Sequence, residues 1–120
     1  ALELCNQTIA HTEEHHFTQV RAKAINCRAE LYRKHQAFEA ALSEHMRAIE
    51  LLDDIGAKCD LAETYFQLGL TYQHKNDLIQ SQTAFQKAIQ LFQEINAPKQ
   101  IEKVSQWLVE NQETFENSGI

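Results

Sequence analysis

The sequence predicts an all-α fold, an α-α superhelix of antiparallel helix pairs with a C-terminal capping helix. Three observations predict it. Only three Gly and one Pro occur in 120 residues, too few turn-forming residues for a chain of many short strands. Apolar residues recur at steps of three and four, the spacing of an amphipathic helix. The sequence also matches itself at one fixed shift, which pairs Ala22 with Ala62 and is typical of a repeat array.

The self-match divides the chain into units within one domain, 1–120. We expect a half repeat over 1–16, full repeats over 17–56 and 57–97, and a capping helix over 98–116. The chain is expected to be a fragment of a larger protein. Besides Ala22 and Ala62, the matched pairs are Tyr32 with Tyr72, Ala48-Ile49 with Ala88-Ile89, Leu51 with Leu91, Ile55 with Ile95, and Ala57 with Ala97.

Six helices are expected from the apolar spacing. Each alone would be marginally stable in water, so each must bury one face against its neighbours. In chain order, the predicted helices are 1–14, 18–35, 38–54, 58–75, 78–95 and 98–116.

The ends of the first three helices follow from register and from one glycine. Ile9 matches Ile49 one repeat later, so the first helix corresponds to the second helix of a repeat. The second helix ends in the Arg33–Gln36 stretch, which corresponds to a turn further along the chain. The third ends before Gly56, because glycine commonly terminates helices.

Polar residues and a proline set the remaining ends. Lys75-Asn76-Asp77 is a tight turn between two helices, in which Asp77 or Asn76 is the N-cap. Asn96 takes the place that Gly56 has one repeat earlier, and Pro98 is placed to begin the last helix.

Charge and cysteine content exclude several classes of protein. The formal net charge is −6, and the sequence has no run of Lys and Arg of the kind that binds the phosphates of nucleic acids. No apolar run is long enough to span a membrane, and no secretory signal is present. Cys5, Cys27 and Cys59 are odd in number and form no C-x-x-C. We interpret them as partly buried thiols in a cytoplasmic protein.

One string in the sequence has the pattern of an enzyme site. His11-Thr12-Glu13-Glu14-His15 satisfies H-x-x-E-H, in which His11 and His15 could hold zinc and Glu14 could act as the base. The more ordinary interpretation is a solvated helix end, where histidine suits the helix dipole. Adventitious metal binding stays open. We expect no catalytic residues, no resident metal and no cofactor.

The helix pairs resemble tetratricopeptide repeats, in a long-period form of about 40 residues found in bacterial signalling proteins and cell-polarity adaptors. The second unit carries Tyr65, Leu68-Gly69, Tyr72, Ser81, Phe85 and Ala88 at the family's positions. The first unit carries Ile25, Arg28-Ala29, Tyr32, Ala41, His45 and Ala48. Arg28 and His45 depart from the family pattern.

The resemblance implies that the first helices of successive repeats line a concave groove. Phe66, Leu70 and Trp107 would form an apolar strip flanked by polar groups, as at many interfaces. The alternative is that Phe66 and Leu70 belong to the core. Carried over to this sequence, the predicted contact residues are Lys23, Asn26, Glu30, Arg33, Phe66, Leu70, Gln73 and Trp107.

The function that these patterns favour is a non-catalytic scaffold module that binds a peptide or a helix in the groove. One alternative is a regulatory domain that senses a peptide and gates an attached output domain. A remote alternative is a zinc hydrolase centred on His11, Glu14 and His15. The expected partner is a protein or peptide, not nucleic acid or membrane, and self-association through helix 1–14 is a further expectation.

Overall fold

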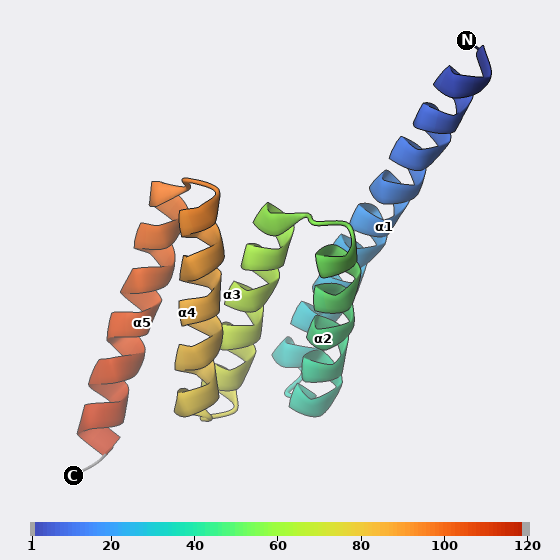
Figure 1. Cartoon of the computed structure of the whole chain (residues 1–120). Helices are drawn as coiled ribbons and strands as arrows, with labels where there is room; N and C mark the ends of the chain where they lie inside the picture. Colours follow the sequence, from blue (N-terminus) through green and yellow to red (C-terminus); the bar gives the residue numbers. More distant parts are fainter. Residues whose placement is uncertain (1, 119–120) are drawn as a thin grey trace.

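The computed structural model describes the backbone of residues 2–118 and the side chains of residues 16–109. Within this part the chain is helical, with no strand, and each helix packs against the next (Figure 1). No helix in the part described is long and apolar enough to cross a membrane. In chain order, the helices are α1 (Leu2–Lys34), α2 (Phe38–Asp54), α3 (Lys58–His74), α4 (Leu78–Glu94) and α5 (Pro98–Ser118).

The four turns share one backbone conformation. Gln36, Gly56, Asn76 and Asn96 follow one another at a constant interval of half a repeat, and each has a positive φ. At the second turn, the Gly56 N–H donates to the Asp53 carbonyl (3.1 Å) and the following residue's N–H donates to the Leu52 carbonyl (3.0 Å). This pair of bonds is the Schellman motif, and the other three turns repeat it.

The predicted helix ends at these turns agree with the structure. Gly56 ends α2 with a φ of +67°, a conformation in which glycine avoids the strain of a Cβ atom. Asp77 is the N-cap of α4, and its carboxylate accepts from the Gln80 N–H. Pro98 is the first residue of α5, where its missing N–H costs no helical hydrogen bond.

The turn predicted between helices 1–14 and 18–35 is wrong, because α1 runs as one helix from Leu2 to Lys34. His16 lies as far before Gln36 as Gln36 lies before Gly56, at the position where a further turn would fall. The next residue is Phe17, whereas each observed turn continues with Ala or Asp. No Gly, Pro, Asn or Asp interrupts 14–18, so nothing in the local sequence opposes continuation of the helix.

The core lies between the helices and is tightest where small residues face aromatic rings. Phe85, Ala88 and Ala48 are fully buried. A Cβ atom added to Gly69 would lie 2.5 Å from two ring atoms of Phe85. Glycine is therefore required at this position for the ring to approach the α3 backbone. The Ser81 hydroxyl donates to the Gly69 carbonyl (2.8 Å) and fixes the same contact between α3 and α4.

Candidate binding groove between α1 and α3

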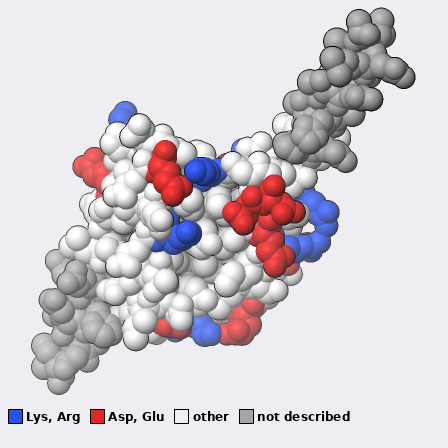
Figure 2. Space-filling view, viewed as in Figure 1, with Lys and Arg blue, Asp and Glu red and all other residues white. Residues whose placement is uncertain are grey.

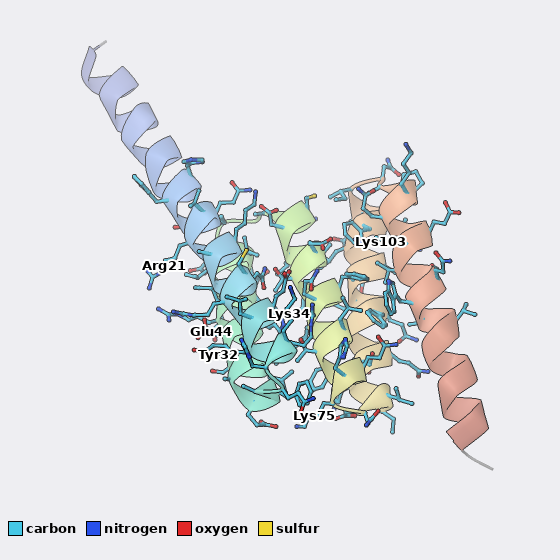
Figure 3. All side chains as sticks on the ribbon, turned by 180° about the vertical axis from the view of Figure 1, so that it is seen from behind. Arg21, Tyr32, Lys34, Glu44, Lys75 and Lys103 are labelled. Atoms are coloured by element: carbon cyan, nitrogen blue, oxygen red, sulfur yellow. The ribbon has the colours of Figure 1, made fainter. Side chains whose placement is uncertain are left out.

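The first helices of the two pairs, α1 and α3, lie side by side (Figure 3), and two pockets are lined by their residues. We call the surface that contains these two pockets the groove. Part of it is a pocket of about 280 Å³ between the two helices. We call this the acidic pocket, because three carboxylates and one ammonium group line it. Its residues are Lys23, Asn26, Cys27 and Glu30 from α1, and Asp60, Glu63 and Gln67 from α3.

Two carboxylates of the acidic pocket are held in place by neighbouring side chains. The Gln19 amide donates to Asp60 Oδ2 (2.5 Å), and Lys23 Nζ lies 3.9 Å from Asp60 Oδ1. The Gln67 amide donates to Glu63 Oε1 (3.2 Å). These bonds orient the carboxylates without neutralising the surplus of negative charge, so the pocket suits a cationic group.

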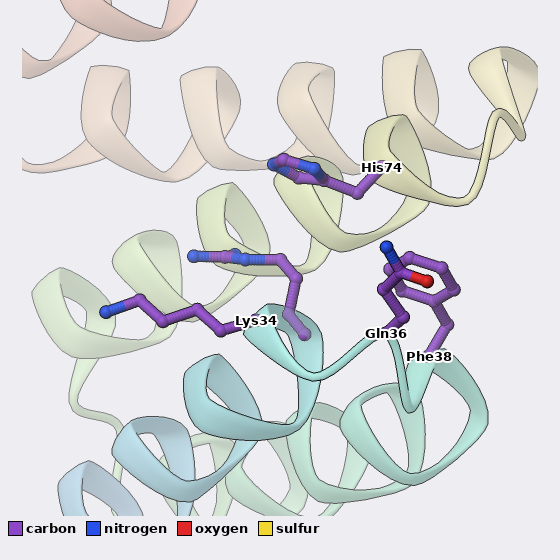
Figure 4. A pocket seen from close by; sticks show the side chains of 5 residues that line it. Lys34, Gln36, Phe38 and His74 are labelled. Atoms are coloured by element: carbon purple, nitrogen blue, oxygen red, sulfur yellow. The ribbon is translucent and has the colours of Figure 1, made fainter.

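A second pocket, of about 380 Å³, lies at the C-terminal ends of the same two helices (Figure 4). It contains no carboxylate, and we call it the basic pocket. Its residues are Arg33, Lys34, Gln36, Phe38 and His74. Such a lining suits an anionic group, which arginine and lysine bind through charge-assisted hydrogen bonds.

Arg33 connects the two pockets. Its guanidinium donates to Gln67 Oε1 (3.1 Å) and to the Gln67 carbonyl (3.4 Å). Burial lowers the pKa of Arg33, and the negative charge of Glu30 opposes this effect. The groove therefore changes sign along its length, from carboxylates at Glu30 and Glu63 to a guanidinium at Arg33.

A polar cluster lies beneath the groove. The Asn26 amide donates to the Thr64 hydroxyl (2.6 Å), which donates to the Asp60 carbonyl (2.8 Å). His45 is fully buried, with Nδ1 3.2 Å from Asn26 Oδ1 and Nε2 2.9 Å from Thr71 Oγ1. No buried polar side-chain atom in the described part lacks a partner, as expected for native interiors.

The environment of His45 fixes its charge. Burial, with a smaller contribution from the positive charge of Arg33, lowers its pKa to about 4. The ring is therefore neutral near pH 7, with one donor and one acceptor nitrogen. Nδ1 faces the Asn26 side-chain oxygen and Nε2 faces the Thr71 hydroxyl, which also donates to the Gln67 carbonyl (3.1 Å).

The predicted contact residues divide between groove and core. Lys23, Asn26 and Glu30 line the acidic pocket, and Arg33 lines the basic one. Asn26 is only half-buried, but both ends of its amide are bonded within the protein. It therefore supports the groove more than it offers bonds to a ligand.

The prediction of an exposed apolar strip formed by Phe66, Leu70 and Trp107 is wrong, and the structure supports the alternative that Phe66 and Leu70 belong to the core. Phe66 is only 2% exposed, and its ring packs 5.6 Å from that of Phe85 and 6.5 Å from that of Trp107. Leu70 and Trp107 are half-buried against the same core. The reason is that α5 covers this face of α3, and Lys103 Nζ lies 4.6 Å above the Phe66 ring.

Gln73 is half-buried and lines neither pocket. Beyond the predicted contact residues, the structure adds Lys34, Gln36, Phe38 and His74 to the basic pocket, and Cys27, Asp60, Glu63 and Gln67 to the acidic pocket. Asp60 could have been found, because it precedes Glu63 by three residues and so shares its face of α3.

The H-x-x-E-H string lies outside the described side chains, and so does Cys5. Among the residues that are described, no group of three or more His, Cys, Asp or Glu side chains could hold a metal ion. Cys27 and Cys59 are exposed free thiols, which corrects their predicted partial burial. The chain matches no protein-family model, and a search of curated proteins finds no match either.

Proposed function

We propose that this chain is a non-catalytic protein-interaction module of tetratricopeptide type, which binds an extended peptide or a helix along the groove between α1 and α3. The observation that carries the proposal is the groove itself. First helices of successive repeats line it, and its acidic and basic pockets lie in sequence along it. A peptide with a cationic side chain toward one end and a carboxylate toward the other fits this pattern.

The repeat arrangement supports the superhelical part of the proposal. The helices α2, α3 and α4 each contain 17 residues, and turns of one conformation separate them at a constant interval. A constant step between packed helices generates a solenoid with one concave surface. A module of this kind binds its partner without catalysing a reaction. Consistent with this, His45 is fully buried and bonded within the protein, so it meets no substrate.

A displayed library of random peptides, panned on the purified chain, tests the proposal. Selected peptides are expected to carry Lys or Arg toward one end and Asp or Glu toward the other. Isothermal titration should then show Lys34→Glu weakening the best peptide about tenfold or more. Lys99→Glu, a matched change of an exposed lysine on α5, should leave affinity unchanged.

The complementary measurement is the affinity of the selected peptide for a variant in which the charge of the acidic pocket is reversed at one residue. Glu63→Lys should weaken the same peptide, and Glu50→Lys on the exposed face of α2 is its control. Equal affinity for all four variants and the unmodified chain would place the interface elsewhere. Circular dichroism of each variant establishes that the helices are intact before affinity is compared.

A further inference from the structure

A further pocket, of about 300 Å³, lies among α2, α3 and α4. We call it the outer pocket. Its apolar wall consists of Met46 from α2, of Tyr65, Leu68 and Tyr72 from α3, and of Ala84 from α4. None of these residues lines the acidic pocket or the basic pocket, so the outer pocket is a separate site.

Polar side chains surround the mouth of the outer pocket. Gln80, Thr83 and Lys87 of α4 line it and are exposed, and Met46 is 50% exposed. The surface over α4 is largely uncharged in Figure 2, where α2 and α4 lie toward the viewer as in Figure 1. An apolar wall that ends in a few polar groups is the usual lining of a site for a small molecule.

The chain itself fills the equivalent space in the first helix pair. One repeat earlier, Leu68 corresponds to Arg28 and Ala84 corresponds to Glu44. Arg28 donates to Glu44 Oε2 from Nε (2.9 Å) and from Nη2 (2.6 Å), so this pair of side chains joins α1 to α2. In the second helix pair, leucine and alanine replace the two long charged side chains. The outer pocket is therefore a space that side chains occupy one repeat earlier.

The volume and the lining of the outer pocket indicate the class of ligand. A cavity of about 150 Å³ holds one benzene ring, so the outer pocket has room for two fused rings. The rings of Tyr65 and Tyr72 favour an aromatic neighbour in tilted or offset contact. The sulfur of Met46 favours the edge of such a ring. The lining therefore suits an aromatic molecule.

Charges of both signs act at the outer pocket. Burial raises the pKa of Tyr65, and the negative charge of Asp53 raises it further. Lys87 is the charged residue of the lining. Because the two charges oppose each other, a charged ligand would give up hydration without meeting a field of one sign. An uncharged ligand avoids this cost.

We propose that the outer pocket binds a small uncharged aromatic molecule with two fused rings, of the size of indole. The rings lie against Leu68 and Ala84, in the space that Arg28 and Glu44 fill in the first helix pair. This site is separate from the groove between α1 and α3, and neither proposal depends on the other.

Met46 is the single methionine of the chain, so a ¹³C-methyl methionine label gives one NMR signal, and that signal reports on the outer pocket. Titration with indole, the probe, should shift it saturably with a Kd on the order of 100 μM. Indole-3-acetate and tryptamine, which carry opposite charges, should each bind at least about threefold more weakly. The peptide Gly-Ser-Trp-Ser-Gly should also bind more weakly, because ordering its flexible chain costs free energy.

Two variants close the outer pocket in different ways. Leu68→Arg combined with Ala84→Glu introduces the pair that the first repeat holds at the same positions, and should weaken indole at least about tenfold. Thr83→Trp fills the mouth from an exposed position and should have the same effect. Because Thr83→Trp leaves the core unchanged, it tests the proposal even where the double change disturbs folding. Circular dichroism of each variant shows whether the helices are intact.

Each variant has a matched control. Arg28→Leu combined with Glu44→Ala removes the original pair from the first repeat and leaves the lining of the outer pocket unchanged. Gln100→Trp adds the same ring as Thr83→Trp, at an exposed position of α5. Both controls should bind indole with the affinity of the unmodified chain.

Several results would overturn the proposal. These are the absence of a saturable shift up to about 5 mM indole and equal affinity of Thr83→Trp and Gln100→Trp for indole. Tighter binding of indole-3-acetate or of tryptamine would contradict the assignment to an uncharged ligand. Tighter binding of the tryptophan peptide would assign the outer pocket to an aromatic side chain of a partner protein instead.

Discussion

The two helix pairs fill equivalent positions between their helices with chemically different side chains. In the second pair, Phe85 of α4 lies against Phe66 of α3 at a ring separation of 5.6 Å. One repeat earlier, the same two positions hold His45 of α2 and Asn26 of α1, whose side chains are 3.2 Å apart and hydrogen-bonded. An aromatic pair and a polar pair are thus interchangeable in one backbone, provided that both members change together.

The difference shows that the effect of a buried polar residue on stability depends on the residue that it bonds to. His45 alone looks like a defect in a repeat whose counterpart is phenylalanine. With Asn26 and Thr71 beside it, both ring nitrogens are satisfied, so the desolvation of the imidazole is offset by two hydrogen bonds. Introducing only one residue of the polar pair at the aromatic positions should therefore lower the free energy of unfolding.

The largest expected effect comes from placing the polar residues of the first helix pair at the aromatic positions of the second. Phe85→His should lower the free energy of unfolding by about 3–5 kcal/mol, because the buried ring loses apolar contact and faces Phe66, which cannot bond to it. Adding Phe66→Asn should recover at least about 1 kcal/mol relative to the sum of the single changes. Urea unfolding followed by circular dichroism measures the cycle. Strict additivity of the two changes would show that the paired positions are independent.

The next effect is a pH dependence confined to the first pair. The folded-state pKa of His45 is about 4, below its ordinary value of about 6.5 in the unfolded chain. The unfolded state therefore binds the proton first, and stability falls as pH drops from about 6.5 toward 4. About 2 kcal/mol should be lost between pH 7 and pH 5 from this residue.

A comparison of unfolding free energies at the two pH values isolates that contribution. In His45→Gln, which retains a polar amide but does not titrate, the pH dependence over this interval should be correspondingly smaller. An unchanged difference between pH 7 and pH 5 in His45→Gln would mean that other groups cause it.

The smallest effect concerns how the second helix of each pair begins. Asp77 caps α4 through its bond to the Gln80 N–H, whereas α2 begins after Ala37, which makes no side-chain cap. Asp77→Ala should destabilise the chain by about 1 kcal/mol, and Ala37→Asp should stabilise it by about 0.5–1 kcal/mol. Thermal unfolding of the two variants measures both signs. A destabilising Ala37→Asp change would show that the two turns are not equivalent.

Local sequence signals predicted most of the helices. The prediction of 38–54 coincides with α2, because the apolar spacing and Gly56 are properties of neighbouring residues. The single helix α1 was not predicted, since the repeat register suggested a turn near His16 where no helix-ending residue is present. A repeat register gives the position of a turn only when the residues there can form it.

The candidate groove was predicted less completely than the helices. Its α1 side was implied by the resemblance to tetratricopeptide repeats, and Lys23 and Glu30 line a pocket between α1 and α3. Phe66 was misplaced because its burial depends on Trp107, which lies two helices later in the chain. Helix periodicity shows that a residue is apolar on a given face, but not which later helix covers that face.

The packing of each helix against its chain neighbours also has a consequence for folding kinetics. Most contacts join residues that are close in sequence, so little loop-closure entropy opposes their formation. Among the residues that the structure describes, α1 and α5 each have one flank without a packed neighbour, whereas α3 contacts α1, α2 and α4, and its Phe66 also contacts α5. Local unfolding should therefore begin at α1 and α5 and reach α3 last, so that the position of a helix in the chain sets when it unfolds.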